Sequence, residues 1–383
     1  MAEPLPKKPQ PMQSDEFWMG QALELAKKGW GQTSPNPMVG CVVVKDGVLV
    51  GQGYHPKAGE PHAEVFALRE AKQQAQGATL YVTLEPCNHH GRTPPCTEAI
   101  LQAGITRVVG GMTDPNPRVQ GIGYERLRQA GLEVTVGILE EACTQLNEGF
   151  IHWVQTGRPL GILKYAMTLD GKIALASGHS FWVTGPESRT EVHRLRAGYD
   201  AVIVGGQTVR QDNPQLTCRL YPGRNPLRVV LSQTLDLPLE AHVWKQEEAP
   251  TVVFTGTEQA PEKANALEAM GIEVIVQDPI SPKTVMETLG QRGLCSALWE
   301  CGGTLAAEAI REGQIQKVLA FIAPKIVGGL GSLGPVGELS FQQMTEALVL
   351  HHVRMQTFGS DFLIEGYLEM APPAPNIFNF ISL

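Results

Sequence analysis

One histidine, one glutamate and two cysteines are spaced so that they could hold a metal ion and carry out a hydrolysis. His62 and Glu64 stand two positions apart, and Cys87 and Cys96 follow within the run that begins at Glu85. One imidazole nitrogen and two thiolate sulfurs form a ligand set that suits zinc. Three protein ligands leave a fourth position for water, as in catalytic zinc sites. The residues therefore predict a zinc ion that activates a water molecule.

Glu64 is the acid–base group that such a site needs. It can take a proton from the water and pass it to a leaving amine, so the predicted reaction removes an amino group from a ring carbon. Zinc-dependent deaminases carry His-x-Glu followed by Pro-Cys-x-x-Cys. Here the cysteines are nine positions apart (96 − 87). A longer loop between two ligands can still close on one ion, because the cost of closure rises slowly with length.

Two other interpretations of these residues stay open at this point. A closed, structural zinc site would take His89 or His90 as its fourth ligand, but it leaves Glu64 without a task. Ordinary buried thiols are a second alternative, which the three-part match disfavours. The chain has seven cysteines, and an odd number spread over a long chain indicates reduced thiols in an intracellular protein. We expect the other five to fill apolar space: Cys41, Cys143, Cys218, Cys295 and Cys301.

Length and composition indicate a globular protein of at least two domains. The chain has 383 residues, of which 43% are hydrophobic and 18% charged. A net charge of −8 argues against a nucleic-acid partner held through phosphates. No run of about 20 apolar residues occurs, so no membrane span is predicted. We expect residues 1–14 to be a disordered leader, and residues 371–383 to be a tail that docks on the body or a partner, or an ordered extension.

The first half alternates predicted strands and helices. Ser14 is the expected N-cap of a helix that ends near Gly29. We expect further elements as strands at 39–44, 48–53, 79–84, 107–112 and 132–136 and helices at 62–75, 97–103 and 122–130. His62 must precede regular helical geometry, because residues two apart do not share a helix face. This alternation predicts a mostly parallel sheet with helices on both faces. Asn36, between two prolines, is either a substrate-binding amide or a plain turn residue.

The pattern restarts after Thr156, which separates a domain of residues 15–155 from one of residues 159–370. We expect strands at 161–167, 201–204, 228–231, 251–254, 273–276 and 297–300, helices at 188–196 and 305–310, and a polar loop at 211–219. One strand leads into Gly302-Gly303 before a helix, where free N–H groups can cradle a phosphate, although a tight turn would use the same residues. No Gly-x-Gly-x-x-Gly occurs. Another strand leads into Gly205-Gly206, and two such exits in one domain with arginines nearby favour a phosphorylated ligand.

The chain from about Ser14 to Glu369 resembles the bifunctional deaminase–reductases of riboflavin biosynthesis. The long insertion between the two cysteines is also this family's own form. The matching segments are residues 35–37, 39–40, 62–64, 83–96, 114–117, 164–172, 177–182, 195–196, 200–204, 208–219, 228–230, 300–305 and 323–325. The resemblance implies two three-layer α/β domains, an N-terminal cytidine-deaminase-like domain and a C-terminal dihydrofolate-reductase-like domain.

The resemblance also implies two consecutive reactions in the cytoplasm. The first would remove the ring amine of a diaminohydroxy-phosphoribosylamino-pyrimidine, with one zinc held by His62, Cys87 and Cys96 and protons moved by Glu64. The second would pass a hydride from NADPH to the ribosyl group and leave a ribityl chain. The partners would be phosphorylated small molecules, with no nucleic acid and no membrane, and we expect a homo-oligomer.

Further site residues follow from the resemblance alone. Those expected at NADPH are Ala166, Trp182, Thr208, Asp212, Gly302, Gly303 and Thr304. Those expected at substrate are Asn36, His89, Ser180, Arg196, Leu216, Arg219 and Glu300. Arg196 and Arg219 among them can fork onto a phosphate. Two positions depart from the family pattern on the cofactor side. Asn213 stands where the family often has a second Asp after Asp212, and Ser232 stands where many members have Asp.

Three alternative functions remain from the residues. A deaminase whose second domain only binds a nucleotide would release ammonia without oxidising NADPH. A nucleic-acid-editing or RNA-binding protein would bind RNA tightly in moderate salt, which the acidic charge disfavours. If the zinc only stabilises a structural scaffold, loss of the Glu64 carboxylate would leave activity intact.

Overall fold

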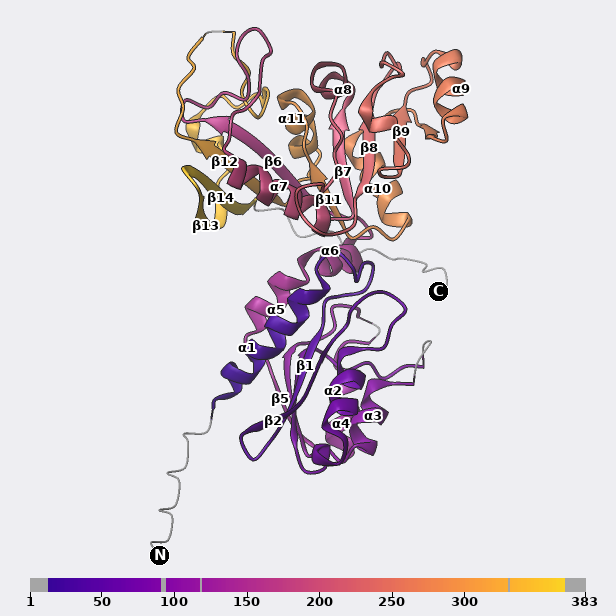
Figure 1. Ribbon diagram of the computed structural model, residues 1–383, viewed down its shortest axis with the longest axis vertical. Coiled ribbons are helices and arrows are strands. Elements are labelled where there is room, and N and C mark those ends of the chain that lie inside the picture. Colours follow the sequence, from indigo (N-terminus) through magenta and orange to yellow (C-terminus); the bar gives the residue numbers. More distant parts are fainter. Residues whose placement is uncertain (1–12, 91–93, 118, 330, 369–383) are drawn as a thin grey trace, which may run out of the picture. The chain divides into compact units, whose positions relative to one another are not determined.

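The computed structural model describes residues 13–90, 94–117, 119–329 and 331–368. The chain divides into two units, Met1–Ile151 and His152–Leu383, and Figure 1 labels the helices and strands of both. Most of the predicted leader at 1–14 and the whole predicted tail at 371–383 lie outside the described residues. Among the helices of the described residues, none has both the length and the apolar character that crossing a bilayer requires.

The first unit is built on a five-stranded sheet in the order β2-β1-β3-β4-β5. Its strands are β1 (Gly40–Lys45), β2 (Val48–Tyr54), β3 (Thr79–Leu84), β4 (Arg107–Met112) and β5 (Glu133–Val136). Its helices are α1 (Asp15–Ala26), α2 (Ala63–Ala71), α3 (Cys96–Gln102), α4 (Ile122–Gln129) and α5 (Glu140–Leu146), and α6 (Glu148–Thr156) follows. Ser14 accepts a hydrogen bond from the backbone nitrogen of Phe17 at 3.3 Å, which confirms it as the N-cap of α1.

The prediction of a mostly parallel sheet is confirmed for four of the five strands of this unit, because β2 to β5 all run in one direction and β1 alone is reversed. β3, β4 and β5 run parallel, but β1 is antiparallel to both β2 and β3. The cause is the two-residue turn Asp46-Gly47, whose φ angles of 51° and 73° suit a tight hairpin. The crossover through α2 therefore joins β2 to β3, and β1 is inserted between these two strands in the opposite direction.

Helices cover both faces of this sheet, as the sequence predicted (Figure 1). One face packs against α2, α3 and α4 through buried residues such as Ala67, Ile100 and Leu127. The other face packs against α1 and α5 through residues such as Met19 and Cys143. The result is three layers. The starts of α2 and α3 lie on one face, near the end of β3.

The second unit is built on a nine-stranded sheet in the order β10-β9-β8-β7-β11-β6-β12-β14-β13. Its strands are β6 (Leu160–Thr168), β7 (Ala201–Gly205), β8 (Leu227–Leu231), β9 (Thr251–Thr255), β10 (Glu273–Val276), β11 (Ser296–Trp299), β12 (Lys317–Ala323), β13 (Leu350–Phe358) and β14 (Asp361–Leu368). Its helices are α7 (Pro186–Gly198), α8 (Gly206–Asp212), α9 (Pro261–Ala269), α10 (Pro282–Gln291) and α11 (Gly303–Arg311). All neighbours from β10 to β12 are parallel, whereas β14 and β13 are antiparallel.

Two apolar cores flank this larger sheet. α10 and α11 pack on one face through residues such as Met286 and Ala306, and α8 and α9 pack on the other through Val209 and Leu267. The predicted polar loop at 211–219 is corrected at its start, because α8 extends to Asp212. The sequence pattern predicted no helix or strand at α5, α6, α8, α9, α10, β12, β13 or β14.

Gly40 allows α1 to lie directly on β1. A methyl group at Gly40 would overlap the carbonyl oxygen of Ala22 and crowd the backbone nitrogen of Ala26. Both clashes are with backbone atoms, so a side-chain rotation cannot relieve them. Gly20 lies in α1 itself, and nothing lies within 4 Å of the place that its methyl group would occupy.

These two glycines give a matched test of the packing. We predict that Gly40→Ala lowers the free energy of unfolding of the first unit by about 2 kcal/mol, because overpacking shifts backbone. Gly20→Ala should raise it by about 0.5–1 kcal/mol, since alanine has the higher helix propensity. Urea unfolding followed by circular dichroism measures both. Equal effects of the two substitutions would contradict the close approach of α1 to β1.

Candidate metal centre and cofactor cleft

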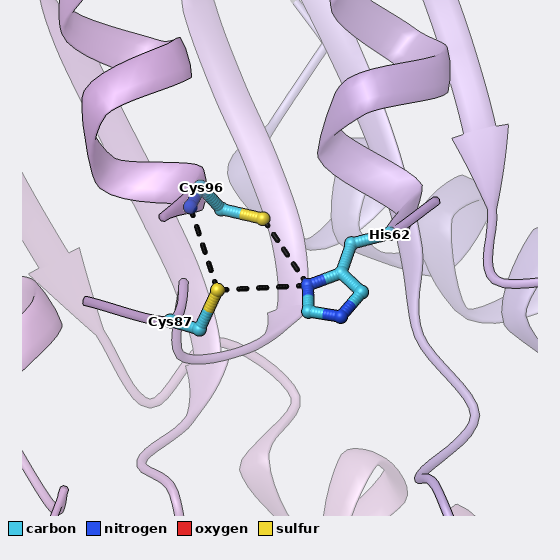
Figure 2. A group of neighbouring side chains, drawn as sticks. All are labelled: His62, Cys87 and Cys96. Carbon is cyan, nitrogen blue, oxygen red and sulfur yellow. Dashed lines mark hydrogen bonds between the residues drawn. The ribbon is translucent and has the colours of Figure 1, made fainter. Parts of the chain in front are cut away.

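His62, Cys87 and Cys96 come together from three separate elements (Figure 2). His62 is the N-cap of α2, Cys87 follows β3, and Cys96 is the first residue of α3. Their ligand atoms all lie within 4.8 Å of one another. The Nδ1 atom of His62 lies 3.3 Å from the Cys96 sulfur and 3.6 Å from the Cys87 sulfur. His62 thus precedes the regular helix, as the spacing from Glu64 required.

The start of α3 closes the loop between the two cysteines. The backbone nitrogen of Cys96 donates to the Cys87 sulfur at 3.4 Å, and that of Thr97 donates to the Cys87 carbonyl oxygen at 3.2 Å. The Thr97 hydroxyl donates to the Asn88 side-chain oxygen at 2.7 Å. A helix N-terminus carries partial positive charge, so this position favours negatively charged sulfur.

The electrostatics of the cluster favour a thiolate. Hydrogen bonding to Cys96 and to His62 outweighs burial and lowers the pKa of the Cys87 thiol to about 4. The hydrogen bond to Cys87 raises the pKa of His62 to about 8. The same contact with Cys87, together with burial, raises the pKa of Cys96. Zinc and protons compete for these lone pairs, so a cation among the three atoms would replace the shared protons.

Glu64 carries a buried oxygen atom without a partner. The residue is 3% exposed, and its Oε2 atom makes no hydrogen bond within the described part of the chain. Burial raises the pKa of this carboxyl group, and nearby His62 offsets part of the rise. A buried polar atom left unpaired costs about 1–3 kcal/mol. A water molecule held by zinc at the neighbouring cluster would satisfy it, so these residues fit the metal.

A fourth protein ligand is not present among the described residues. His89 and His90 are exposed, and the group of ligand atoms that could share an ion contains only His62, Cys87 and Cys96. The donor set therefore fits a catalytic zinc site with water in the fourth position better than a closed structural site.

Two further predicted residues of the first unit lie beside the metal cluster. The Nδ2 atom of Asn36 lies 3.1 Å from Nε2 of His55, whose ring packs edge-on against the His62 ring. Burial lowers the pKa of His55. His89 lines a small cavity of about 150 Å³ that also contains Cys87 and Asp114.

Glu85 is a supporting residue that the sequence reading left without a role. Its buried carboxylate accepts from the backbone nitrogens of Asp114 at 3.0 Å, Gly121 at 2.9 Å and Gly123 at 2.8 Å. It therefore ties the segment between β4 and α4 to the segment that carries Cys87. The signals were present, as Glu85-Pro86-Cys87 and the motif at 114–117, but neither motif shows that the two segments touch.

A cleft of about 710 Å³ lies in the second unit, at the carboxyl ends of parallel strands, where α/β sheets usually bind ligands. Six of the seven residues predicted at NADPH line it: Ala166, Thr208, Asp212, Gly302, Gly303 and Thr304. Ser180 and Glu300 line it as well. The residues that line the cleft do not include Trp182, Arg196, Leu216 or Arg219. Trp182 is 57% exposed, with the Arg189 guanidinium 4.5 Å from its ring centroid.

Gly302 shapes the cleft at the start of α11. Nothing lies within 4 Å of the place that a methyl group on Gly302 would occupy, so this glycine leaves open space beside free N–H groups of the helix. A methyl group on Gly303 would crowd the Gly334 oxygen at 2.9 Å and the Gly337 nitrogen at 3.1 Å. An open cradle at a helix N-terminus fits a phosphate of a nucleotide cofactor.

Glu300 is held by two cations at the end of β11. Arg196 donates to both of its carboxylate oxygens, at 2.6 Å and 2.9 Å, and Lys164 lies 3.6 Å away. Burial acts against ionisation, but Arg196 and Lys164 lower the pKa of Glu300 to about 2. The guanidinium fork of Arg196, expected to bind a phosphate, thus pairs with Glu300, because a buried carboxylate needs a partner.

Two arginines hold the backbone of the segment that carries Leu216 and Arg219. Arg196 donates to the Thr217 carbonyl oxygen at 3.2 Å, and the fully buried Arg228 donates to the Gln215 carbonyl oxygen at 3.3 Å. Leu216 between them has a φ of 56°, which is unusual for a side chain of this size. Arg219 is exposed. Arg228 lies in a segment that resembles the family, but its sequence position gives no sign of this supporting role.

The two departures from the family pattern have different surroundings. The Asn213 side-chain oxygen accepts from the His242 backbone nitrogen at 2.7 Å, a bond that an aspartate oxygen makes equally well. Asn213 does not line the cleft, whereas Ser232 does. Only the second departure therefore changes a group that faces the cleft.

Two family models match the chain. The RibD C-terminal domain matches residues 159–364, and the cytidine and deoxycytidylate deaminase zinc-binding region matches residues 12–112. The riboflavin biosynthesis protein RibD of Synechocystis is 57% identical over 357 residues, which cover 93% of this chain and 97% of that protein.

Solved structures extend the similarity to the fold. Acinetobacter baumannii RibD superposes with a TM-score of 0.82 and 40% identity, covering 93% of this chain and 99% of that one. A Thermotoga maritima protein, described as a diaminohydroxyphosphoribosylaminopyrimidine deaminase and 5-amino-6-(5-phosphoribosylamino)uracil reductase, superposes with a TM-score of 0.81 and 41% identity. The superposition covers 92% of this chain and 98% of the Thermotoga protein.

Metal content tests the three-ligand cluster directly. We predict about one zinc per chain in the purified protein and a loss of most of it in Cys96→Ser, because removing one of three ligands weakens the site strongly. Cys143→Ala, a buried cysteine of the same unit outside the cluster, should keep its zinc. Elemental analysis after dialysis measures both variants. Full zinc retention in Cys96→Ser would contradict the assignment.

Proposed function

Because the chain belongs to the RibD family of bifunctional riboflavin-biosynthesis enzymes, we propose a division of two reactions among the residues described above. The chain is a deaminase and a reductase that acts on small pyrimidine molecules, as its motifs predicted. We assign the deaminase to residues 15–155 and the reductase to residues 159–370. Each half contains one of the two sites described above.

The deaminase proposal is carried by one observation, the unpaired Oε2 atom of Glu64 beside three converging ligand atoms. We propose that His62, Cys87 and Cys96 hold zinc, and that Asn36 and His89 bind the substrate. The substrate would be a diaminohydroxy-phosphoribosylamino-pyrimidine, as in the description of the Thermotoga protein. Zinc, when bound, supplies the Lewis acidity that makes water a nucleophile near neutral pH.

Glu64 would carry the proton in both halves of this reaction. It takes a proton from the attacking water, whose oxygen adds to the ring carbon that bears the amine. It then delivers that proton to the amine nitrogen, the carbon–nitrogen bond breaks, and ammonia leaves. A raised pKa suits this exchange, because a carboxyl group that both accepts and gives a proton works best with a pKa near the working pH.

For the reductase, we propose that the cleft binds NADPH along Ala166, Thr208, Asp212 and the start of α11, with Trp182 at its outer side. The cofactor supplies the hydride that converts the ribosyl group to a ribityl chain. Glu300, ionised and fixed by Arg196, would accept hydrogen bonds from substrate hydroxyl groups, and Ser180 would donate to the substrate. Leu216 and Arg219 would contact the substrate from the segment that Arg228 supports. The preference for NADPH over NADH rests on the resemblance.

We also propose a cytoplasmic homo-oligomer. β13 is the edge strand of the larger sheet, and its exposed residues include Val353 and Met355, with Val349 just before it. An apolar edge of this kind is usually covered by another chain. All seven cysteines lie in the described part and none forms a disulfide, which agrees with a reducing compartment.

Glu64→Gln separates the two activities. We predict that this variant keeps its zinc, because the glutamate is not a ligand, and lowers ammonia release at least about 100-fold, because it removes general acid–base catalysis. Reductase turnover on substrate that is already deaminated should be unchanged. Ammonia release and NADPH oxidation, measured on one preparation, check both. Loss of the two activities together would contradict separate sites.

Gly302→Val tests the cofactor cradle. The Cβ atom of the added side chain has no neighbour within 4 Å, so we expect the fold to tolerate the change while the cofactor phosphate loses its place. We predict that the KM for NADPH rises about 10-fold, which corresponds to about 1.4 kcal/mol, and that ammonia release is unchanged. Initial rates with NADPH and with NADH check the change and the cofactor preference together. An unchanged KM would place the cofactor elsewhere.

A further inference from the structure

Asn36 and His55 meet at the open end of the β1–β2 hairpin. Gly40 at the start of β1 pairs with Tyr54 at the end of β2, and the His55 backbone nitrogen donates to the Val39 carbonyl oxygen at 2.9 Å. The hairpin therefore brings together the residues that precede β1 and those that follow β2. The two side chains touch there, with Asn36 Nδ2 3.1 Å from His55 Nε2.

The contacts of His55 determine which of its nitrogens carries hydrogen. Nδ1 lies 3.1 Å from the Pro61 carbonyl oxygen, and a carbonyl oxygen can only accept, so Nδ1 is the donor. Nε2 of the neutral ring then accepts from the Asn36 amide nitrogen. The opposite amide orientation would place two acceptors together unless the ring took a second proton. That would bury a charge on a residue that is 3% exposed.

This arrangement fixes the orientation of the Asn36 amide. Its nitrogen is turned to His55, and its Oδ1 atom makes no hydrogen bond to the described part of the chain. We propose that His55 is a positioning residue that presents the Asn36 oxygen to the pyrimidine. The deaminase site then selects a substrate group that donates a hydrogen bond, such as a ring N–H or an exocyclic amine. The inference rests on the proposed role of Asn36 in substrate binding.

A competing role for His55 acts on the metal ligand instead. Its ring lies edge-on to the His62 ring, with centroids 5.7 Å apart, and Pro61 directly precedes His62. A residue that only supported His62 would affect zinc content. A residue that orients Asn36 would affect the KM of the deaminase and leave the zinc in place.

A double-mutant cycle distinguishes these roles. Asn36→Ala, His55→Phe and the double variant are compared in the full-length zinc enzyme by deaminase kcat and KM, zinc content and reductase rate. We expect each single change to raise the deaminase KM about 10-fold, the range of one lost hydrogen bond. The double variant should be no worse than Asn36→Ala alone, because both changes remove the same contact. Zinc content and reductase rate should match the unmodified enzyme.

His55→Gln is the matched conservative variant. A glutamine amide offers one donor for Pro61 and one acceptor for Asn36, so it should recover most of the affinity that His55→Phe loses. It also keeps the test decisive if the phenylalanine variant folds poorly. Recovery by glutamine and a non-additive cycle together support the inference.

Other outcomes overturn the inference in distinguishable ways. If the increases in KM of the two single variants multiply in the double variant, His55 acts independently of Asn36. Zinc loss with an unchanged KM would assign His55 to His62. An unchanged KM in Asn36→Ala would overturn both the inference and the substrate role of Asn36. Absence of ammonia release from the unmodified enzyme would overturn the deaminase assignment, and the inference with it.

Discussion

The proposed chemistry of the first unit depends on one buried carboxylate oxygen, Oε2 of Glu64, which has no partner within the described part of the chain. Proteins rarely leave such an atom without a partner, because its lost hydration is costly. Glu64 tolerates this state because it sits in the first turn of α2 beside His62, where zinc and its water would supply the missing partner. The folded protein therefore contains a buried polar atom that a bound metal and its water would satisfy. In the proposed reaction, a side chain that bound Oε2 would prevent Glu64 from acting as the base.

The second unit meets the opposite requirement, because its buried carboxylate must stay ionised and fixed. Glu300 receives both arms of Arg196 and lies near Lys164, so two cations surround one anion at the edge of the cleft. Breaking a buried pair of this kind typically costs about 3–5 kcal/mol, because the remaining charge is left uncompensated. The same arginine holds the Thr217 carbonyl oxygen. Charge at the cleft and the shape of the adjacent segment are thus coupled through Arg196.

Residue type and spacing were sufficient to predict which residues converge in the candidate metal site. His62, Glu64, Cys87 and Cys96 have few alternative uses in that pattern, and β3 and β4 were placed at their observed limits. The direction of β1 could not be obtained in this way, because alternation of strands and helices does not show which strand a hairpin inserts between two others. α9 was not assigned, since its alanine and glutamate residues give little apolar periodicity. α10 was not assigned either, although Val285, Met286 and Leu289 follow helical spacing and Ser281 caps its start.

The residues that sequence reading missed all act through contact rather than through chemistry of their own. Glu85 binds three backbone nitrogens from another loop, Arg228 binds carbonyl oxygens from segments distant in sequence, and His55 orients an amide 19 positions away. A motif records which residues stand near one another along the chain. It carries no information on which loop a buried polar group must satisfy, and that information appears only when hydrogen-bond partners are assigned atom by atom. The supporting residues are therefore visible in the structure as partners of buried polar groups, whereas Oε2 of Glu64 is a buried atom without a partner in the described part of the chain.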